Sequence, residues 1–162
     1  MDELERGISI SMTGEARAAA LALFLGQIGK WEVALPPVEP LVLDFGLGDF
    51  ARIGLIEYWI ANETAAGYCG KYLFLFDGQS CPTHHHVTKT ETFFVVKGKM
   101  GVRYAGADRM LQAGDVLLVE SSVDHGMTAD GPCLFLELSS PCSIDDNCFL
   151  DSAIPIGRNA RR

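Results

Sequence analysis

Residues 78–98 read GQSCPTHHHVTKTETFFVVKG, and this stretch decides how the rest of the chain is interpreted. His84 and His86 are separated by one residue. On a β-strand, whose side chains alternate with a period of two, they project from the same face, and His85 projects from the opposite one. Glu91 follows His86 after four intervening residues. That is far enough for the chain to bring its carboxylate back beside the imidazoles.

Two imidazoles and one carboxylate form a ligand set that suits a divalent transition metal. Such ligands favour Mn, Fe, Co, Ni or Zn and disfavour Ca or Cu(I). Adjacent histidines could also be a solvated strand end or the remnant of an expression tag. A tag is normally longer and terminal, whereas these histidines lie mid-chain in an apolar, glycine-bounded strand pattern. The sequence therefore predicts a metal site that a distant fourth ligand completes.

The spacing of the opening stretch resembles the first cupin motif, in which Gly, His-x-His, Glu and Gly follow one another at set distances. The matching residues are Gly78, His84, His86, Glu91 and Gly98. Residues 114–129, GDVLLVESSVDHGMTA, resemble the second cupin motif. The resemblance implies that His125 is the fourth metal ligand. It also implies an all-β fold, the cupin double-stranded β-helix or jelly-roll barrel.

Length and charge limit the class of protein and of partner. The chain has 162 residues, 48% of them hydrophobic, which is enough for one domain with a sizeable core. It contains no run of roughly 18 apolar residues that would span a membrane. The formal net charge of −8 argues against nucleic acid or an anionic membrane surface as a partner. A small molecule is the expected ligand.

The cysteines indicate a reducing compartment. There are five, an odd number without CxxC spacing: Cys69, Cys81, Cys133, Cys142 and Cys148. No signal peptide pattern precedes the chain, so we expect reduced thiols and a cytoplasmic protein. Cys81 lies close to the expected metal site and is the one cysteine of functional interest.

The N-terminal part of the chain is expected to be helical. Residues 13–29 are rich in Ala and Leu and begin with Thr13, which can cap a helix. Leu21, Phe24, Leu25 and Ile28 recur at helical spacing and form an apolar face that needs cover, on the barrel exterior or at a subunit contact. Three prolines then make residues 35–40 a linker.

The rest of the chain reads as short strands with glycine turns, the pattern of an antiparallel sandwich or barrel. The expected strands are 41–45, 52–62, 68–76, 84–87, 91–97, 100–104, 116–119, 125–128 and 133–139. We therefore expect an N-terminal helix and linker over residues 1–40, a barrel domain over 41–157, and a loose tail over 158–162. The apolar outer faces and the habit of cupins suggest a homodimer.

Two charged residues stand out within apolar strands. Lys71 shares its strand face with Leu73 and Leu75, and its side chain could simply snorkel from the strand end. Glu137 lies among the apolar residues of CLFLELSS, where it either faces water on an edge strand or is paired with a cation, a metal or a substrate hydroxyl. The pattern leaves both questions open.

Longer stretches carry a closer resemblance. They are LDFGLGDFARIGLIEYWIAN (43–62), YCGKYLFLFDGQSCPTHHH (68–86), ETFFVVKGKMGVRY (91–104) and ELSSPCSIDDNCFLD (137–151). Together they resemble the D-lyxose ketol-isomerase family over residues 41–157. The resemblance implies an aldose-ketose isomerase of a small sugar such as D-lyxose or D-mannose, with a divalent metal, usually Mn.

The same resemblance implies roles for individual residues. The metal ligands are His84, His86, Glu91 and His125, the substrate-contacting lysine is Lys71, and the acidic residue of the last core strand is Glu137. The family's Asp-rich stretch corresponds to Asp145 and Asp146. In the mechanism that follows, Lys71 holds the sugar oxygen and Glu137 moves the proton between C1 and C2. An aspartate of the tail is the alternative base.

Two other functions use the same ligands. Three histidines and a glutamate can bind Fe for a cupin dioxygenase, in which Lys71 and Glu137 would have no clear role. A non-catalytic cupin could bind a sugar as a sensor or accessory protein. Oxygen consumption would favour the first, and an intact metal site without isomerase activity the second.

Overall fold

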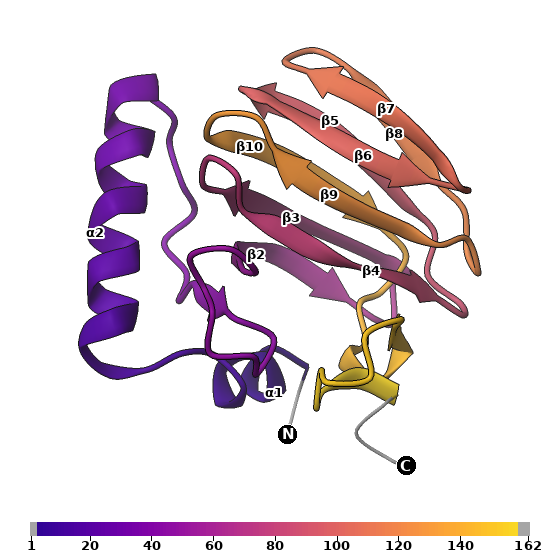
Figure 1. Ribbon diagram of the computed structural model, residues 1–162. Helices are drawn as coiled ribbons and strands as arrows, with labels where there is room; N and C mark the ends of the chain where they lie inside the picture. The colour runs from indigo at the N-terminus through magenta and orange to yellow at the C-terminus, as the bar shows by residue number, and fades with distance from the viewer. Residues whose placement is uncertain (1–2, 159–162) are drawn as a thin grey trace.

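The computed structural model describes residues 3–158 (Figure 1). Two helices, α1 (Glu3–Ser9) and α2 (Gly14–Trp31), come first. The elements that follow are β1 (Leu41–Leu43), β2 (Leu55–Glu63), β3 (Tyr68–Leu75), β4 (Ser80–His86), β5 (Glu91–Lys97), β6 (Lys99–Tyr104), β7 (Ala107–Gln112), β8 (Val116–Val119), β9 (His125–Ala129), β10 (Cys133–Ser139), the 3-10 helix η1 (Ile144–Asp146) and β11 (Asn147–Phe149).

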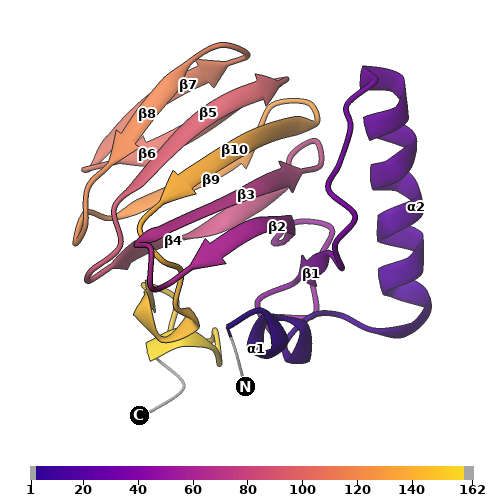
Figure 2. The same ribbon diagram turned by 180° about the vertical axis from the view of Figure 1, so that it is seen from behind.

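The strands form two antiparallel sheets that lie face to face (Figures 1 and 2). The six-stranded sheet has the order β1-β2-β3-β10-β5-β8, and the five-stranded sheet has the order β11-β4-β9-β6-β7. Consecutive strands β4 and β5 belong to different sheets, so the chain crosses the sandwich between them. The expectation of an all-β jelly-roll barrel with an N-terminal helix is confirmed.

Several elements differ from the sequence expectation. β4 begins at Ser80, four residues before the predicted strand, and α1, β7 and β11 were not predicted. β7 is an edge strand in which only Leu111 is buried, so it carries no apolar alternation to detect. β11 has three residues and exists through its pairing with β4, which local sequence does not reveal.

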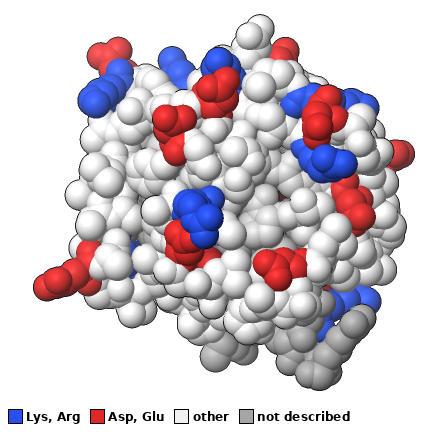
Figure 3. Space-filling model, in the orientation of Figure 1, with Lys and Arg blue, Asp and Glu red and all other residues white. Residues whose placement is uncertain are grey.

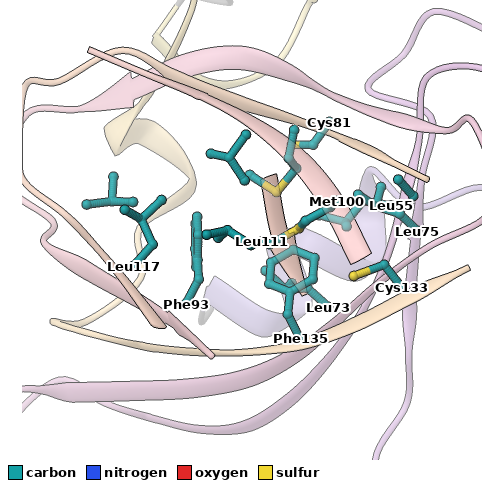
Figure 4. Close-up of a cluster of buried hydrophobic side chains, with 14 of the residues drawn as sticks. Leu55, Leu73, Leu75, Cys81, Phe93, Met100, Leu111, Leu117, Cys133 and Phe135 are labelled. Carbon is teal, nitrogen blue, oxygen red and sulfur yellow. The ribbon is translucent and has the colours of Figure 1, made fainter. Parts of the chain in front are cut away.

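The core lies between the two sheets (Figure 4). Inward residues of β3, β5 and β10, among them Leu75, Phe93 and Phe135, have exposures of 0–3%. Each large apolar side chain buried in this way contributes about 1.5–3 kcal/mol of transfer free energy. Gly98 makes the β5–β6 turn with φ of 81°, and a Cβ there would collide with the Pro132 carbonyl, which explains the glycine at the end of the opening stretch.

Helix α2 stands against the outer face of the six-stranded sheet, at one side of the sandwich (Figure 1). Phe24 is fully buried and meets Phe74 of β3 edge to face, with ring centroids 4.9 Å apart. The predicted stripe is partly wrong, because Leu25 is 52% exposed. Thr13 precedes the helix, but its side chain makes no capping hydrogen bond, contrary to expectation.

The linker and the C-terminal end have little regular structure. Residues 35–40 form neither helix nor strand. Of the predicted tail, residues 159–162 lie outside the described residues, and the Nε of Arg158 donates to the Asp145 carbonyl at 3.2 Å. Neither described helix could by itself cross a membrane; α1 and α2 satisfy the length and composition test only as a pair, bent by 112°.

Candidate metal centre

Three histidines converge inside the barrel. His84 and His86 come from β4, and β4 pairs with β9 so that His84 lies opposite His125. The ring centroid of His84 is 4.9 Å from that of His86 and 4.3 Å from that of His125. One nitrogen of each ring lies within 4.8 Å of the others, and all three side chains are buried. The spacing of a single metal site is therefore present.

Backbone carbonyls orient two of these rings. The Nδ1 of His84 is 2.8 Å from the Pro82 carbonyl oxygen, and the Nδ1 of His125 is 3.0 Å from that of Val123. A carbonyl can only accept, so Nδ1 carries the hydrogen and Nε2 keeps its lone pair for a metal. Burial, and then the neighbouring histidines, lower the pKa of His84 well below its ordinary value. Neutral imidazole is the form that binds a metal.

Glu91 reaches the histidines from the opposite sheet. Its Oε1 is 3.3 Å from the Nε2 of His86, and its Oε2 is 3.1 Å from the Nε2 of His125. Burial raises the pKa of Glu91, but Lys89 and the two histidines lower it by more, so the net direction is downward. Glu91 is therefore ionised at neutral pH.

Several buried atoms of this group make no hydrogen bond within the described part of the chain. They are Nδ1 and Nε2 of His86, Oε2 of Glu91 and Nε2 of His125. A buried polar atom without a partner costs about 1–3 kcal/mol, so four such atoms side by side are unfavourable unless another group completes them. A divalent cation would satisfy three of these lone pairs at once. The arrangement thus fits the predicted ligand set.

Lys71 and Glu137 meet beside the histidines. β3 and β10 pair with Lys71 opposite Glu137, and Lys71 Nζ is 3.3 Å from the Oε2 of Glu137. Lys71 is 5% exposed and Glu137 is 2% exposed, and β10 lies in the middle of its sheet. The interpretation of Lys71 as a snorkelling side chain and that of Glu137 as an edge-strand residue that faces water are therefore both wrong. The two residues form a buried ion pair.

Glu57 of β2 extends this pair and was not predicted. Its Oε2 is 3.2 Å from Lys71 Nζ and accepts a 2.7 Å hydrogen bond from the Trp59 indole. Burial alone lowers the pKa of Lys71, but Cys142, Glu137 and Glu57 raise it by more, and the result lies well above the ordinary value. A carboxylate within the apolar strand LIEYW was a detectable signal, since the same pattern singled out Glu137.

Lys89 is the second residue that sequence reasoning missed. It lies in the link between β4 and β5, and its Nζ is 2.5 Å from Glu91 Oε1 and 3.0 Å from Glu137 Oε1. Its exposure is 3%. Burial lowers the pKa of Lys89, whereas Glu137 and Glu91 raise it, and the net direction is upward. Lys89 thus connects the metal ligands to the Lys71–Glu137 pair.

The buried cluster carries an excess of negative charge. Its carboxylates are Glu57, Glu91 and Glu137 and its ammonium groups are Lys71 and Lys89, so the sum is −3 + 2 = −1 when all are ionised. A divalent cation would offset this excess, and Coulomb interactions are strong where water is excluded. By contrast, acidic and basic side chains are interspersed at the surface in Figure 3, where water screens them.

Two small cavities adjoin the cluster. The first, about 40 Å³, has His84, His86, Glu91, Cys81 and Phe149 among its lining residues. The second, about 50 Å³, also touches Trp59 and Cys142. Each has room for a few water molecules. The two cavities share Glu57 and Lys71 among their lining residues, so they are neighbours.

Of the other singled-out residues, Cys81 lines the cavity at the cluster, and His85, Asp145 and Asp146 do not. His85 points away from it, with its Nδ1 2.9 Å from the Asp124 carboxylate, as the alternation predicted. Burial raises the pKa of the Cys81 thiol, which keeps it protonated. Asp145 pairs with Arg6 at the surface, and the Asp146 carboxylate binds the link between β4 and β5. Neither aspartate lines the cavity at the histidines.

Comparison with known families agrees with this geometry. Residues 75–139 match the family model of the cupin domain, and the topology and the histidine positions are those expected of it. The chain has the cupin fold, and its residues 75–139 are similar in sequence to the cupin domain. Residues 41–103 also match the family model of D-lyxose isomerase, which supports the closer resemblance.

Two curated relatives share part of the sequence. The D-lyxose/D-mannose isomerase of Thermosediminibacter oceani is 40% identical over 80 residues, which are 44% of this chain and 43% of that protein. The D-lyxose ketol-isomerase of Cohnella laeviribosi is 38% identical over 90 residues, 52% of this chain and 43% of that protein. The chain therefore matches less than half the length of either relative.

Solved structures support the fold over a longer range. The L-ribose isomerase of Geodermatophilus obscurus superposes with a TM-score of 0.74 over 90% of this chain and 95% of its own, at 17% identity. The L-ribose isomerase of Acinetobacter sp. DL28 gives the same values. KdgF from Halomonas sp. has a TM-score of 0.52 and 23% identity, covering 55% of this chain and 80% of its own.

Proposed function

We propose that this protein is a metal-dependent aldose-ketose isomerase that acts on a small sugar such as D-lyxose or D-mannose. The observation that carries the proposal is a buried lysine-carboxylate pair, Lys71 and Glu137, directly beside three converging histidines. The matches to D-lyxose isomerases support the same reaction class. A dioxygenase has no use for such a pair.

His84, His86, Glu91 and His125 would hold the cation, with Mn as the first choice and Zn, Fe, Co or Ni as alternatives. When bound, a divalent cation polarises a carbonyl and stabilises the negative charge that develops on its oxygen. The lone pairs directed at one another and the excess negative charge support this assignment.

The protein's own side chains account for the proton transfers. Isomerisation moves one proton from C2 to C1 and one from O2 to O1, and it needs no oxidant. Glu137 takes the C2 proton and returns it to C1, while the Lys71 ammonium gives a proton to O1 and recovers one from O2. Lys71, Lys89 and the hydroxyl of Ser139 all contact the Glu137 carboxylate at 3.0–3.3 Å, which fixes its direction.

Substrate binding requires rearrangement of this site. A cavity of about 40 Å³ holds a few water molecules but is too small for a pentose. The cavity of about 50 Å³ shares Glu57 and Lys71 with it as lining residues. We expect the side chains between the two cavities to shift when sugar binds, which would exclude water from the reacting atoms.

The reaction is tested with purified protein and Mn²⁺, assayed for ketose formation from D-lyxose and D-mannose. Glu137→Gln removes the proton acceptor at constant size, so we expect turnover to fall by about 10²–10⁴-fold with metal content unchanged. Glu120→Gln, an exposed carboxylate, is the matched control. Full activity of Glu137→Gln contradicts its role. A wild-type protein that binds metal but isomerises no pentose or hexose contradicts the proposed function.

The ligand set is tested by metal analysis. His84→Ala and His125→Ala each remove one imidazole, and we expect each variant to lose stoichiometric metal after gel filtration. His85→Ala changes the neighbouring residue on the opposite face and should retain it. Stoichiometric metal in His84→Ala or His125→Ala would refute the ligand set.

We further propose that this protein is a homodimer. The outer face of β10, β5 and β8 exposes Leu138, Phe94, Val116 and Leu118 by 38–61%, and α2 packs on other residues of that sheet. Contiguous exposed apolar residues are typical of an interface between protein chains. Light scattering at micromolar concentration is the test, and a monomer there contradicts the proposal.

A further inference from the structure

The Asp146 carboxylate gathers the backbone of the link between β4 and β5. Its two oxygens accept hydrogen bonds from the amides of Val87 at 3.1 Å, of Thr88 at 3.1 Å and of Lys89 at 3.0 Å, and from the Thr88 hydroxyl at 2.8 Å. Asp146 is 6% exposed. The chain separation between the carboxylate and these donors is 57–59 residues. The link is therefore shaped by a distant residue.

This link has little internal structure of its own. It carries the chain from β4 in one sheet to β5 in the other, and no helix or strand covers residues 87–90. Its consecutive amides need hydrogen-bond partners, although the side chains of Val87 and Thr88 are exposed and that of Lys89 is buried. The carboxylate supplies these partners.

The segment that carries Asp146 is held in place by pairing with β4. Asp146 ends η1, and the next residues form β11, which pairs with β4 so that Asn147 lies opposite His86 and Phe149 opposite His84. The strand that holds two histidines and the link that follows it are thus both fixed by one C-terminal segment. Figures 1 and 2 show this segment at the edge of the five-stranded sheet.

The ammonium group of Lys89 is placed by the same link. With its amide bound to Asp146, Lys89 turns its side chain inward, where Nζ contacts both Glu91 and Glu137. Asp146 does not line the cavity at the histidines. It therefore acts on the groups there through the Lys89 side chain.

We propose that Asp146 is a positioning residue, which folds residues 87–89 around its carboxylate and so holds the Lys89 ammonium between Glu91 and Glu137. The catalytic part of this inference rests on the proposed isomerase function. A displacement of about 1 Å at a reacting group can lower a rate by about 100-fold. Loss of the Asp146 hydrogen bonds should therefore lower turnover. It should leave the histidines in place, because they lie on β4 and β9.

Amine labelling tests the position of Lys89 without any activity measurement. The protein is treated briefly with acetic anhydride, and acetylation of each lysine is followed by mass spectrometry of its peptides. Lys99, whose side chain is 52% exposed, is the internal reference. In wild type, opening of the buried site limits the reaction, so we expect Lys89 to react at least about tenfold more slowly than Lys99.

Asp146→Asn is the principal variant, because it removes the charge at nearly constant size and replaces one acceptor by a donor that faces amide groups. We expect Lys89 to become acetylated within about threefold of the Lys99 rate, with metal content unchanged. In the isomerase assay kcat should fall by about 100-fold with a smaller change in KM.

Asp145→Asn is the matched control. It changes the neighbouring carboxylate of the same 3-10 helix, which pairs with Arg6 at the surface. Lys89 labelling, kcat and KM should all stay at wild-type values.

Thr88→Val decides the matter if Asp146→Asn does not fold. It removes the hydroxyl donor and leaves the backbone amides in place. We expect an increase in Lys89 labelling over wild type that is smaller than in Asp146→Asn, of about two- to threefold.

Unchanged protection of Lys89 in a folded Asp146→Asn overturns the proposal, and so does unchanged protection in Thr88→Val if the first variant fails to fold. Increased labelling with unchanged kcat also overturns the positioning role. If the wild type isomerises no sugar, the proposed function fails, while labelling still decides whether Asp146 holds Lys89 in place.

Discussion

The two ends of the barrel interior differ in character although the same strands build them. On β3 the inward residues run from Lys71 through Leu73 to Leu75, and on β10 they run from Glu137 through Phe135 to Cys133. One end thus holds a cluster of charges and the other is apolar. The apolar end contributes stability through burial, whereas the charged end costs desolvation that its ion pairs only partly offset.

This difference indicates that the apolar end stabilises the fold and that the charged end serves function. An apolar core of this depth gives the sandwich enough stability to hold buried charges close together without water. A set of buried charges is weak evidence for stability, but buried, coupled titratable groups in one cavity are characteristic of functional sites. Substitutions along a single strand can therefore separate the two roles.

The largest effect is expected at the charged end. Lys71→Met leaves Glu57 and Glu137 buried without their shared cation, and breaking a buried pair costs about 3–5 kcal/mol. Adding Glu57→Gln removes the carboxylate charge that has lost its cation, whereas Glu137 keeps Lys89, so the double variant should be more stable than Lys71→Met alone. Denaturant unfolding of Lys71→Met, of Glu57→Gln and of the double variant measures this. A double variant with additive losses would show that the charges are not coupled.

A slightly smaller effect is expected at the apolar end of the same strand. Leu75 is fully buried, and Leu75→Ala should lower the free energy of unfolding by about 2–5 kcal/mol through the cavity that it leaves. Metal content and kcat should stay near wild type below the unfolding temperature. Loss of metal from the folded variant would mean that the two ends are not independent.

The smallest effect is a pH dependence that belongs to the charged end alone. Burial lowers the pKa of His84 and His86, so the unfolded chain binds more protons than the folded one just below about pH 6.5. Stability of the metal-stripped protein should therefore fall as the pH decreases through this region, by up to about 1.4 kcal/mol per pH unit for each histidine. Denaturant unfolding is measured from about pH 8 to about pH 5.5, on both sides of the ordinary histidine pKa of about 6.5. These measurements give the slope of stability against pH.

His84→Ala is the control for this slope. It should remove the contribution of one proton, whereas Leu75→Ala should shift the whole curve and leave the slope unchanged. A wild-type slope of zero would contradict the assignment of neutral, buried imidazoles.

The local pattern predicted much of the charged end. His84 and His86 share a face, because side chains on a strand alternate with a period of two. The pattern left the burial of Lys71 and Glu137 open, and the family resemblance implied their roles. The cupin resemblance added His125, which the structure places beside His84. The same alternation in LIEYW places Glu57 among apolar residues, so the sequence carries a signal for Glu57 as well.

The sequence by itself therefore determined the all-β class, the alternation within each strand and which residues share a face, since these follow from short-range geometry. Only the tertiary structure decided that Glu91 approaches from the opposite sheet, that Lys89 links it to Glu137, and that Asp146 shapes the segment between them. The physical reason is that an irregular link has no period from which a direction can be read. Its conformation is set by hydrogen bonds to a carboxylate that folding brings from nearly sixty residues away.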